Sequence, residues 1–419
     1  MNEERTVLVG AGEDRHLDEL ERLAKTLGMT VVARMEQNRR DNTGYLGKGK
    51  RRELGSLVEE TRARFVVADD ELTASQARVL EKAANATIVD RTELIIRIFE
   101  SHARDAASRL QAELADLEYR LPRVKGRNPE LSRLGGGVGT RGPGEQQLEY
   151  DRRVIRERIG TINRKLRDER AARAVQSSKR RRGEGPPRVA LVGYTNAGKT
   201  TILNALSGAD RSVRDWLFET LETTTRLVEG GTGGREDGSS HPDFVVTDTV
   251  GFIRKLPTQL VHSFASTLEA ASDADVLVIC ADASSERLDE EIFTVRHTLQ
   301  ETLKTDNGSS HSKGQILCLN KVDLLDEGRS FELRRRYPEA VLISALQGDT
   351  GLLKEAIYAA IEERRERMEV LIPHSDYAHA SRLYGVAEIH ASKNTTEGLW
   401  MDVSLPRASS ARYEPYRVD

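Results

Sequence analysis

The sequence predicts an α/β protein built in several parts. Short apolar runs of strand length alternate with helical patterns in two stretches, residues 1–93 and 183–367. Such strands normally lie parallel, because each helix returns the chain to the same edge of the sheet. The 419 residues also exceed the size at which one core usually keeps growing. We expect an N-terminal parallel α/β domain (1–93), a basic helical hairpin linker (94–182), a second α/β domain (183–367) and a short α+β module (368–419).

The composition is typical of a soluble, charged globular protein, with 38% hydrophobic, 31% charged and 5% aromatic residues. Cys280 and Cys318 lie in apolar runs, so we expect buried thiols and no disulfide framework. The histidines lack the spacing of a zinc site. The N-terminus lacks the basic region of a signal peptide, and no apolar run is long enough to span a membrane. We therefore expect a cytoplasmic protein without a membrane span. We also expect it to be a monomer.

In the N-terminal domain, strands are predicted at residues 7–9, 31–33, 65–68 and 88–89. The linker shows apolar residues at helical spacing over 94–121 and again over 148–166, which predicts two long amphipathic helices. These helices can pack as an antiparallel pair, with Arg152, Arg153, Arg156 and Arg158 largely in solvent. Residues 122–145 between them are dense in Gly, Pro and Arg and predict a long loop.

The middle of the chain is basic. From Arg97 to Arg188 there are 23 Lys and Arg against 13 Asp and Glu, so this segment carries +10 while the whole chain carries -3. A basic segment with a flexible loop suits RNA phosphates, although arginine-rich helices are more often solvated faces.

Residues 176–188 break the helical pattern with Gly, Pro and consecutive charges, and we interpret them as a linker. Strands are predicted after it at 189–192, 244–247, 276–281, 316–319 and 341–343. Two insertions, 229–242 and 305–314, are interpreted as surface loops. The tail carries strand candidates at 386–390 and 399–405.

A phosphate-binding loop follows the first of these strands. Glycines at 193 and 198 let backbone N–H groups point at phosphate oxygens, and the next helix adds positive potential at its N-terminus. Lys199 is expected to reach the β and γ phosphates, and the Thr200 hydroxyl to ligate Mg²⁺. The residues assigned to phosphate binding are Gly193, Tyr194, Thr195, Asn196, Ala197, Gly198, Lys199, Thr200 and Thr201.

Asp248 and Gly251 end the next strand of the apolar series. The carboxylate can hold Mg²⁺ through water, and the glycine amide can meet the γ phosphate. The threonine-rich stretch before that strand can supply the threonine that closes over Mg²⁺. We choose Thr224, with Thr223 and Thr225 as rivals, although a threonine run also suits the edge of a sheet. Lys199, Thr224 and Gly251 are the expected catalytic groups.

Guanine specificity is predicted from Asn320, Lys321 and Asp323 at the carboxyl end of a later strand. An aspartate can accept from both guanine N1–H and the 2-amino group, a donor pair that adenine lacks. Ser344, Ala345 and Leu346 follow one strand further on, and the Ala345 amide can reach guanine O6. Together the motifs predict a P-loop GTPase domain that binds GTP and GDP with Mg²⁺.

With these motifs in place, the chain resembles the HflX family of translational GTPases along almost its whole length. The most specific stretch is GGGVGTRGPGEQQLEYDRRVIRERI, residues 135–159, which is similar to the glycine-rich signature before the family's G domain. Gly47-Lys48-Gly49-Lys50, LVGYTNAGKTTILNAL and DTVGFIRKLP also match. Gln147 and Tyr150 depart from the usual Thr and Thr or Ser, and the two insertions lengthen the G domain.

The resemblance implies binding to the large ribosomal subunit and its rRNA, with a role in splitting or rescuing stalled ribosomes. Phe252 occupies the position where many small GTPases have a water-orienting glutamine, so we expect slow hydrolysis that a partner accelerates. Two alternatives stay open: a nucleotide-gated RNA-binding factor, or a ribosome-assembly factor, with negligible turnover when isolated. A nucleotide site at residues 44–50 is a third hypothesis, less favoured than RNA contact or a plain loop.

Overall fold

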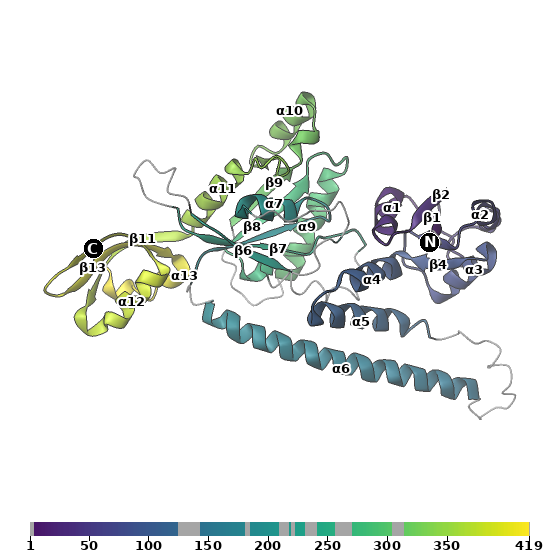
Figure 1. Ribbon diagram of the computed structural model, residues 1–419, viewed down its shortest axis with the longest axis horizontal. Coiled ribbons are helices and arrows are strands. Elements are labelled where there is room, and N and C mark those ends of the chain that lie inside the picture. The colour runs from purple at the N-terminus through teal and green to yellow at the C-terminus, as the bar shows by residue number, and fades with distance from the viewer. Residues whose placement is uncertain are drawn as a thin grey trace. The chain divides into compact units, whose positions relative to one another are not determined.

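A computed structural model of the chain describes residues 4–124, 143–180, 185–208, 218, 223–230, 241–255, 270–303 and 314–418 (Figure 1). The chain divides into two compact units. Unit 1 comprises residues 1–169, 214–222 and 253–265, and unit 2 comprises 170–213, 223–252 and 266–419. Each unit is described by itself.

A four-stranded parallel sheet organises unit 1, in the order β2-β1-β3-β4. All four strands coincide with predicted strand segments and lengthen some of them. The central residues of β1, β3 and β4 are buried, which explains their continuous apolar runs, whereas β2 at the edge of the sheet is largely half-buried or exposed. The strands are β1 (Arg5–Ala11), β2 (Thr30–Gln37), β3 (Phe65–Ala68) and β4 (Thr87–Asp90).

Side chains cap the N-termini of α3 and α4 in unit 1, whereas α1 and α2 begin without a side-chain cap. Thr73 and Gln76 form a capping box at the start of α3, and the Asp90 carboxylate accepts from the Glu93 amide at the start of α4. Leu20, Leu54 and Leu80 from three of the helices are fully buried. These helices are α1 (Leu17–Thr26), α2 (Lys48–Thr61), α3 (Ala74–Ala84) and α4 (Arg91–His102).

The prediction of one helix over 94–121 is wrong. Helix α4 ends at His102, and a new helix, α5 (Ala106–Arg120), begins after Asp105. The Asp105 carboxylate accepts from the Ser108 amide at 2.6 Å, so it caps a second helix and ends the first pattern. Apolar residues keep their helical spacing from α4 into α5, so the end of the first helix could not be recognised from that spacing.

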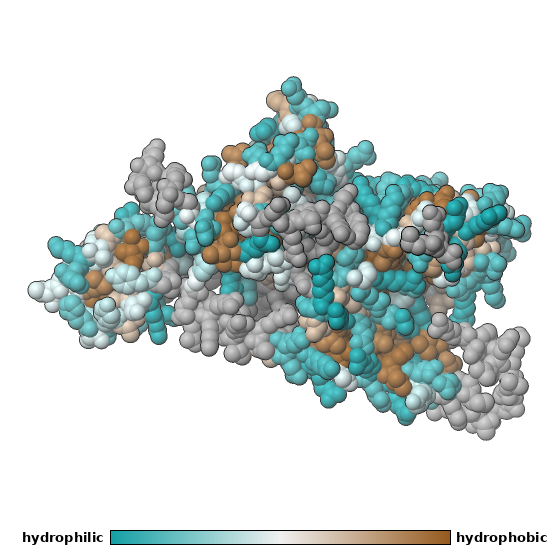
Figure 2. All heavy atoms as spheres, viewed as in Figure 1, coloured by the Kyte–Doolittle hydropathy of each residue, from teal (hydrophilic) through white to brown (hydrophobic). Residues whose placement is uncertain are grey.

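Helix α6 (Pro143–Arg180) is longer than predicted, because residues 176–180, interpreted as linker, continue the helix. It contacts α5 through Leu114, Ile162 and Leu166. Figure 2 shows brown apolar side chains over α5 and α6 beside teal hydrophilic ones. Arg158 pairs with Glu113 through two bonds of 2.6 and 2.8 Å. Most of the predicted glycine-rich loop, residues 125–142, lies outside the described residues.

Unit 2 contains a six-stranded sheet in the order β10-β9-β8-β5-β7-β6. All neighbours are parallel except β6, which pairs antiparallel with β7 at one edge. β6 was not among the predicted strands, although its threonine run was noted to suit the edge of a sheet, which is where it lies. The strands are β5 (Arg188–Gly193), β6 (Thr224–Val228), β7 (Phe244–Asp248), β8 (Val276–Asp282), β9 (Gly314–Asn320) and β10 (Val341–Leu342).

The two faces of this sheet belong to two separate apolar clusters, which helices complete. Ile202 of α7 and Ile357 of α11 belong to one cluster, and Ile292 of α9 and Leu333 of α10 to the other. Cys280 and Cys318 are buried, free thiols, as predicted. The helices are α7 (Lys199–Ser207), α9 (Leu288–Leu303), the short η3 (Val322–Leu324), α10 (Glu327–Arg336) and α11 (Gly351–Glu362).

The C-terminal residues form a three-stranded antiparallel sheet in the order β11-β13-β12. The two predicted tail strands become β12 (Glu388–Asn394) and β13 (Gly398–Pro406), and β11 (Arg365–Pro373) was not anticipated. Helix α12 (Tyr377–Val386) packs on this sheet through Leu383. Short helices complete the module: η4 (His374–Asp376), α13 (Arg407–Ser410) and η5 (Glu414–Tyr416). Among the described helices, none combines the length and apolar character that crossing a bilayer requires.

Candidate nucleotide-binding site

The predicted phosphate loop connects the carboxyl end of β5 to the first turn of α7. Gly198 has φ +82°, and a Cβ there would lie 2.3 Å from Asn320 Nδ2. Only glycine fits both this left-handed backbone and this close approach. Asn196 has φ +63°, a conformation that asparagine tolerates better than most residues. The loop therefore curls over the N-terminus of α7, where backbone N–H groups favour anions.

Lys199 lies inside this curl. Its side chain is almost wholly buried, and its Nζ donates to Tyr194 O at 2.9 Å and to Gly193 O at 3.2 Å. Burial lowers the pKa of Lys199, while the negative charge of Asp248 acts to raise it. A buried ammonium held by two carbonyls is suited to an incoming phosphate, whose charge would further favour the protonated lysine.

The three predicted metal ligands converge at the end of β7. The Thr200 hydroxyl donates to Asp248 Oδ2 at 2.8 Å. Thr224 is the cross-strand partner of Asp248 in the antiparallel pairing of β6 with β7, so both side chains leave the same face of the sheet. Two hydroxyls and one carboxylate are the hard oxygen donors that Mg²⁺ prefers, so the donor set fits this ion.

Gly251 and Phe252 lie directly against the phosphate loop. The Phe252 amide donates to Gly193 O at 3.0 Å, and Phe252 O accepts from the Thr195 amide at 2.7 Å. A Cβ on Gly251 would lie 2.7 Å from Thr195 Cα and 2.9 Å from Lys199 Nζ. The Phe252 side chain is buried in the apolar core. It therefore contributes its backbone to this region and carries no group that could orient water.

Gly251→Ala is expected to destabilise the protein by about 1–3 kcal/mol, because the new methyl group overpacks against Thr195 backbone. Thermal unfolding without nucleotide measures this loss. Gly351→Ala is the matched control in the same unit, since a Cβ there meets nothing within 4 Å. Equal melting temperatures for the two variants would show that Gly251 does not make this close approach.

Asn320 joins the phosphate loop to the guanine motifs. Its Nδ2 donates to Ala197 O at 3.1 Å, and its Oδ1 accepts from the Ala345 amide at 3.0 Å. The Ala345 amide, predicted to contact guanine O6, therefore has an acceptor within the protein, which O6 would share or replace. The side chain of Leu346, the last residue of this motif, is 80% exposed.

Asp323 and Lys321 are also held in place. The Ser344 hydroxyl donates to Asp323 Oδ1, which orients the carboxylate expected to read guanine. Lys321 has φ +68°, and its Nζ donates to Asp282 Oδ2 at 2.7 Å. The predicted nucleotide residues thus lie at the carboxyl ends of β5, β7 and β9, in the segments that follow β5, β7, β9 and β10, and at the starts of α7 and β6.

Two contributors were not recognised from the sequence. Asp282 ends β8 and holds Lys321, and the rule that identified Asn320, a polar residue at the end of an apolar strand, could have found it. Thr195 was assigned only as part of the phosphate loop. Its Oγ1 is buried and has no hydrogen-bond partner within the described part of the chain. No sequence pattern distinguishes such a hydroxyl from a solvated one.

The hypothesis of a site at residues 44–50 concerns a different region, the start of α2. Gly47 precedes the helix, and its amide donates to Gln37 Oε1 at 2.9 Å. Lys50 pairs with Glu53 at 2.7 Å. Part of this basic segment is therefore engaged by the protein itself.

Comparison with solved structures finds a GTP-binding protein from the hyperthermophilic archaeon Sulfolobus solfataricus, solved in complex with GDP. The similarity covers 85% of this chain and 98% of that protein, with a TM-score of 0.43 and 20% identity.

Three family models match consecutive parts of the chain. They are described as GTP-binding GTPase N-terminal, over residues 14–100, GTP-binding GTPase middle region, over 102–180, and 50S ribosome-binding GTPase, over 188–321. GTPase HflX of Caldanaerobacter subterraneus subsp. tengcongensis is 43% identical over 89% of this chain and 84% of its own length. GTPase HflX of Chlamydia pneumoniae is 37% identical over 96% of this chain and 84% of its own. The chain belongs to the HflX family of GTPases.

Proposed function

We propose that this GTPase acts on the large ribosomal subunit and uses its nucleotide cycle to split or rescue stalled ribosomes. The observation that carries the proposal is the match of residues 188–321 to the model of 50S ribosome-binding GTPases. The basic segment from Arg97 to Arg188 supports it, since rRNA is a polyanion. We further propose that the protein works as a cytoplasmic monomer, in contact with rRNA.

The phosphates of GTP are proposed to bind across the loop from Gly193 to Thr201. Backbone N–H groups of the loop and the start of α7 would donate to phosphate oxygens. Lys199 Nζ would exchange its two carbonyl contacts for the β and γ phosphates and stabilise charge in the transition state. The Gly251 amide would donate to the γ phosphate.

The guanine base is proposed to bind at the loops after β9 and β10. Asp323 would accept from N1–H and the 2-amino group, with Ser344 holding one of its oxygens. The Lys321 stem and Leu346 would lie along the base. ATP would offer the Asp323 carboxylate neither of these two donors, and an unmade bond in such a site costs affinity.

Thr200, Thr224 and Asp248 are proposed to hold Mg²⁺, with Asp248 acting through water. Bound Mg²⁺ would neutralise negative charge on the phosphates. Because Phe252 cannot orient water, the isolated protein is expected to hydrolyse GTP slowly. Thr195 Oγ1, buried beside Gly251, is a hydroxyl of this chain that could orient the attacking water or a γ-phosphate oxygen.

Purified large ribosomal subunits are expected to raise steady-state GTP turnover strongly, because an ordered partner fixes the catalytic geometry that the isolated protein lacks. Added salt should remove the stimulation, since contacts to RNA phosphates release counterions. The measurement is phosphate release with and without subunits at two salt concentrations. Small ribosomal subunits at the same concentration are the control. Turnover that subunits leave unchanged would refute the ribosomal proposal and leave the GTPase intact.

An RNA-binding or assembly factor is the second candidate, and Phe252 is the observation that favours it. Such a factor would use the GTP state to dock and hydrolysis only to leave. Sedimentation of intact ribosomes with the protein and a non-hydrolysable GTP analogue distinguishes the two. Release of separate subunits supports splitting, and unchanged ribosomes support assembly.

A further inference from the structure

Thr195 places an unpaired hydroxyl in the interior of unit 2. The residue is 6% exposed, and its Oγ1 is shielded from solvent and has no hydrogen-bond partner within the described part of the chain. Nearly all buried polar groups in proteins are paired, because an unmade bond costs free energy. In a loop that binds a ligand, such a hydroxyl is explained when its partner is the ligand or a water molecule that reacts with it.

Other buried threonines of the chain do have partners. Thr6 and Thr249 are fully buried, and their hydroxyls donate to Glu4 O at 2.9 Å and to Leu191 O at 2.7 Å. In both cases the bond is made to a backbone carbonyl. A threonine hydroxyl that serves only the fold is therefore satisfied within this protein.

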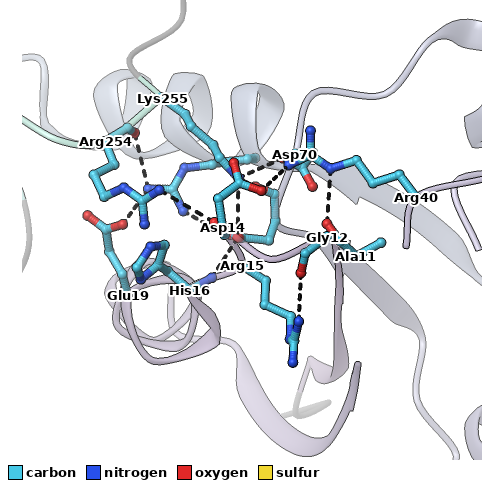
Figure 3. A network of polar contacts seen from close by, with 12 residues as sticks. Ala11, Gly12, Asp14, Arg15, His16, Glu19, Arg40, Asp70, Arg254 and Lys255 are labelled. Carbon is cyan, nitrogen blue, oxygen red and sulfur yellow. Dashed lines mark hydrogen bonds and ion pairs between the residues drawn. The ribbon is translucent and has the colours of Figure 1, made fainter. Parts of the chain in front are cut away.

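The polar side chains at the carboxyl ends of β1 and β3 are paired in the same way (Figure 3). Arg40 Nη2 donates to Asp14 Oδ1 at 2.6 Å and to Asp70 Oδ1 at 2.8 Å, and Arg40 Nε donates to Ala11 O at 3.0 Å. These groups hold the N-terminal domain together and leave their bonds made. Thr195 differs from them.

The carbonyls beside Thr195 are engaged by other donors. Gly193 O accepts from Lys199 Nζ at 3.2 Å and from the Phe252 amide at 3.0 Å, which fills its two lone pairs. Tyr194 O accepts from Lys199 Nζ at 2.9 Å, and Phe252 O accepts from the Thr195 amide at 2.7 Å. The phosphate loop thus pairs its backbone and leaves the Thr195 hydroxyl for something else.

Thr195 lies where the γ phosphate is proposed to bind. A Cβ built on Gly251 would lie 2.9 Å from Thr195 Cγ2 and 2.9 Å from Lys199 Nζ, so the two side chains meet at one point beside Gly251. All three residues belong to unit 2. Lys199 Nζ and the Gly251 amide are the groups proposed to contact the γ phosphate. Oγ1 is carried by the same Cβ as Cγ2 and therefore lies next to that phosphate.

The methyl group of Thr195 fixes the direction of the hydroxyl. Cγ2 packs against Gly251, and a β-branched side chain is restricted in χ1. The bond from the Thr195 amide to Phe252 O holds the backbone as well. The hydroxyl is therefore preorganised, and groups that need not reorganise during the reaction are the most effective in stabilising a transition state.

Other side chains of the site are unsuited to hold the attacking water. Tyr194 and Phe252 belong to the same apolar cluster. The Thr200 hydroxyl donates to Asp248 Oδ2 at 2.8 Å. Thr195 combines a hydroxyl, a buried position and an unmade bond.

A single hydroxyl can contact the phosphate and the water together, because it has one donor and two acceptor lone pairs. It would donate to a γ-phosphate oxygen and accept from the water, whose oxygen then faces the phosphorus. The water oxygen bonds to the γ phosphorus, and the bond to the β–γ bridging oxygen breaks with its electron pair remaining on GDP. One water proton passes to the released phosphate. Since the transition state is loose, the reaction requires positioning of the water more than removal of its proton.

Resting on the proposed GTPase function, we propose that Thr195 is a catalytic residue whose hydroxyl bridges a γ-phosphate oxygen and the attacking water and holds that water in line with the bond that breaks. This hydroxyl takes the place of the side chain that Phe252 lacks. It supplies the basal rate of the isolated protein, from which an ordering partner raises turnover.

Thr195→Val keeps the shape of the side chain and removes the hydroxyl. Hydrolysis is measured in a single turnover, with the full-length protein in excess over GTP and without ribosomes. We expect the rate to fall about a hundredfold, the lower end of the range for loss of one preorganised group. The affinity for a non-hydrolysable GTP analogue should change by no more than about threefold, because the bond to the water matters in the transition state.

Two further variants complete the comparison. Thr195→Ser restores the hydroxyl without the methyl group that orients it, and it should recover at least about tenfold of the lost rate. Thr294→Val on α9 is the matched control, since the Thr294 hydroxyl donates within its own helix to Glu290 O at 2.8 Å. This control should keep both the rate and the affinity.

The melting temperature without nucleotide separates a catalytic role from a structural one. Thr195→Val replaces an unpaired buried hydroxyl by a methyl group, so the melting temperature should stay the same or rise. A clear decrease would show that the hydroxyl has a partner in the fold and would remove the basis of the proposal. If Thr195→Val does not fold, Thr195→Ala decides in its place by the same rate and affinity measurements.

Equal single-turnover rates for Thr195→Val and Thr294→Val overturn the proposal. A loss of analogue affinity as large as the loss of rate also overturns it, since the hydroxyl would then only bind the nucleotide. Failure of the GTPase function itself would look different, because the unaltered protein would then neither bind nor hydrolyse GTP.

Discussion

Lys199→Ala is expected to weaken GTP binding by roughly a hundredfold or more. The ammonium is buried among loop carbonyls, and removal of one partner of a buried charge pair costs about 2–5 kcal/mol. Each 1.4 kcal/mol corresponds to about tenfold in affinity. Equilibrium binding of a fluorescent GTP analogue measures the effect.

The matched control is Lys354→Ala on α11. Lys354 is half-buried, its Nζ donates to Glu229 O at 3.3 Å and lies over the Tyr358 ring, and neither of these residues is assigned to the nucleotide. The melting temperature without nucleotide should stay close to that of the unaltered protein, because the buried charge also carries a desolvation cost. Unchanged GTP affinity in Lys199→Ala would disprove the assignment of the phosphate loop.

Asp323→Asn is expected to exchange guanine preference for xanthine preference. The amide can donate to the 2-oxo group of xanthine, whereas it cannot accept from both guanine donors. Sites that lose such a hydrogen bond discriminate strongly, so we expect at least about a hundredfold loss for GTP relative to XTP. Competition between the two nucleotides for one fluorescent ligand gives the ratio directly.

Asp326→Asn provides the control for this change. Asp326 lies three residues further along and caps α10 by accepting from the Arg329 amide at 2.7 Å, so the same substitution there alters no base contact. Asparagine is also a good N-cap, and stability should be preserved. Retained GTP preference in Asp323→Asn would show that another residue reads the base.

The strands and their parallel arrangement could be predicted because a strand buried on both faces must be apolar along its length. The segments 65–68 and 276–281 show this pattern clearly and became β3 and β8. Helix ends were harder to predict. The break near Asp105 depends on a single cap in an unbroken apolar spacing, and α6 continues through charged residues that a solvated helix tolerates.

The residues of the candidate site could be predicted from the sequence, but the contacts between segments that are distant in the sequence could not. Each motif has its own spacing, and parallel strands bring the ends of their loops to one edge of the sheet. Contacts between distant segments leave no such periodic signal. Lys255 and Asp70 are 185 positions apart, and neither lies in a pattern that indicates the other. The same is true of Phe99 and Phe218.

The side chain of Asn320 has a consequence for how the two halves of a nucleotide bind. One amide group ties the phosphate loop at Ala197 to the base loop at Ala345, so ordering either loop favours order in the other. We therefore expect guanosine and pyrophosphate, offered as separate molecules, to bind cooperatively, each strengthening the binding of the other by the same factor. The affinity for the intact nucleotide therefore cannot be divided into a base share and a phosphate share.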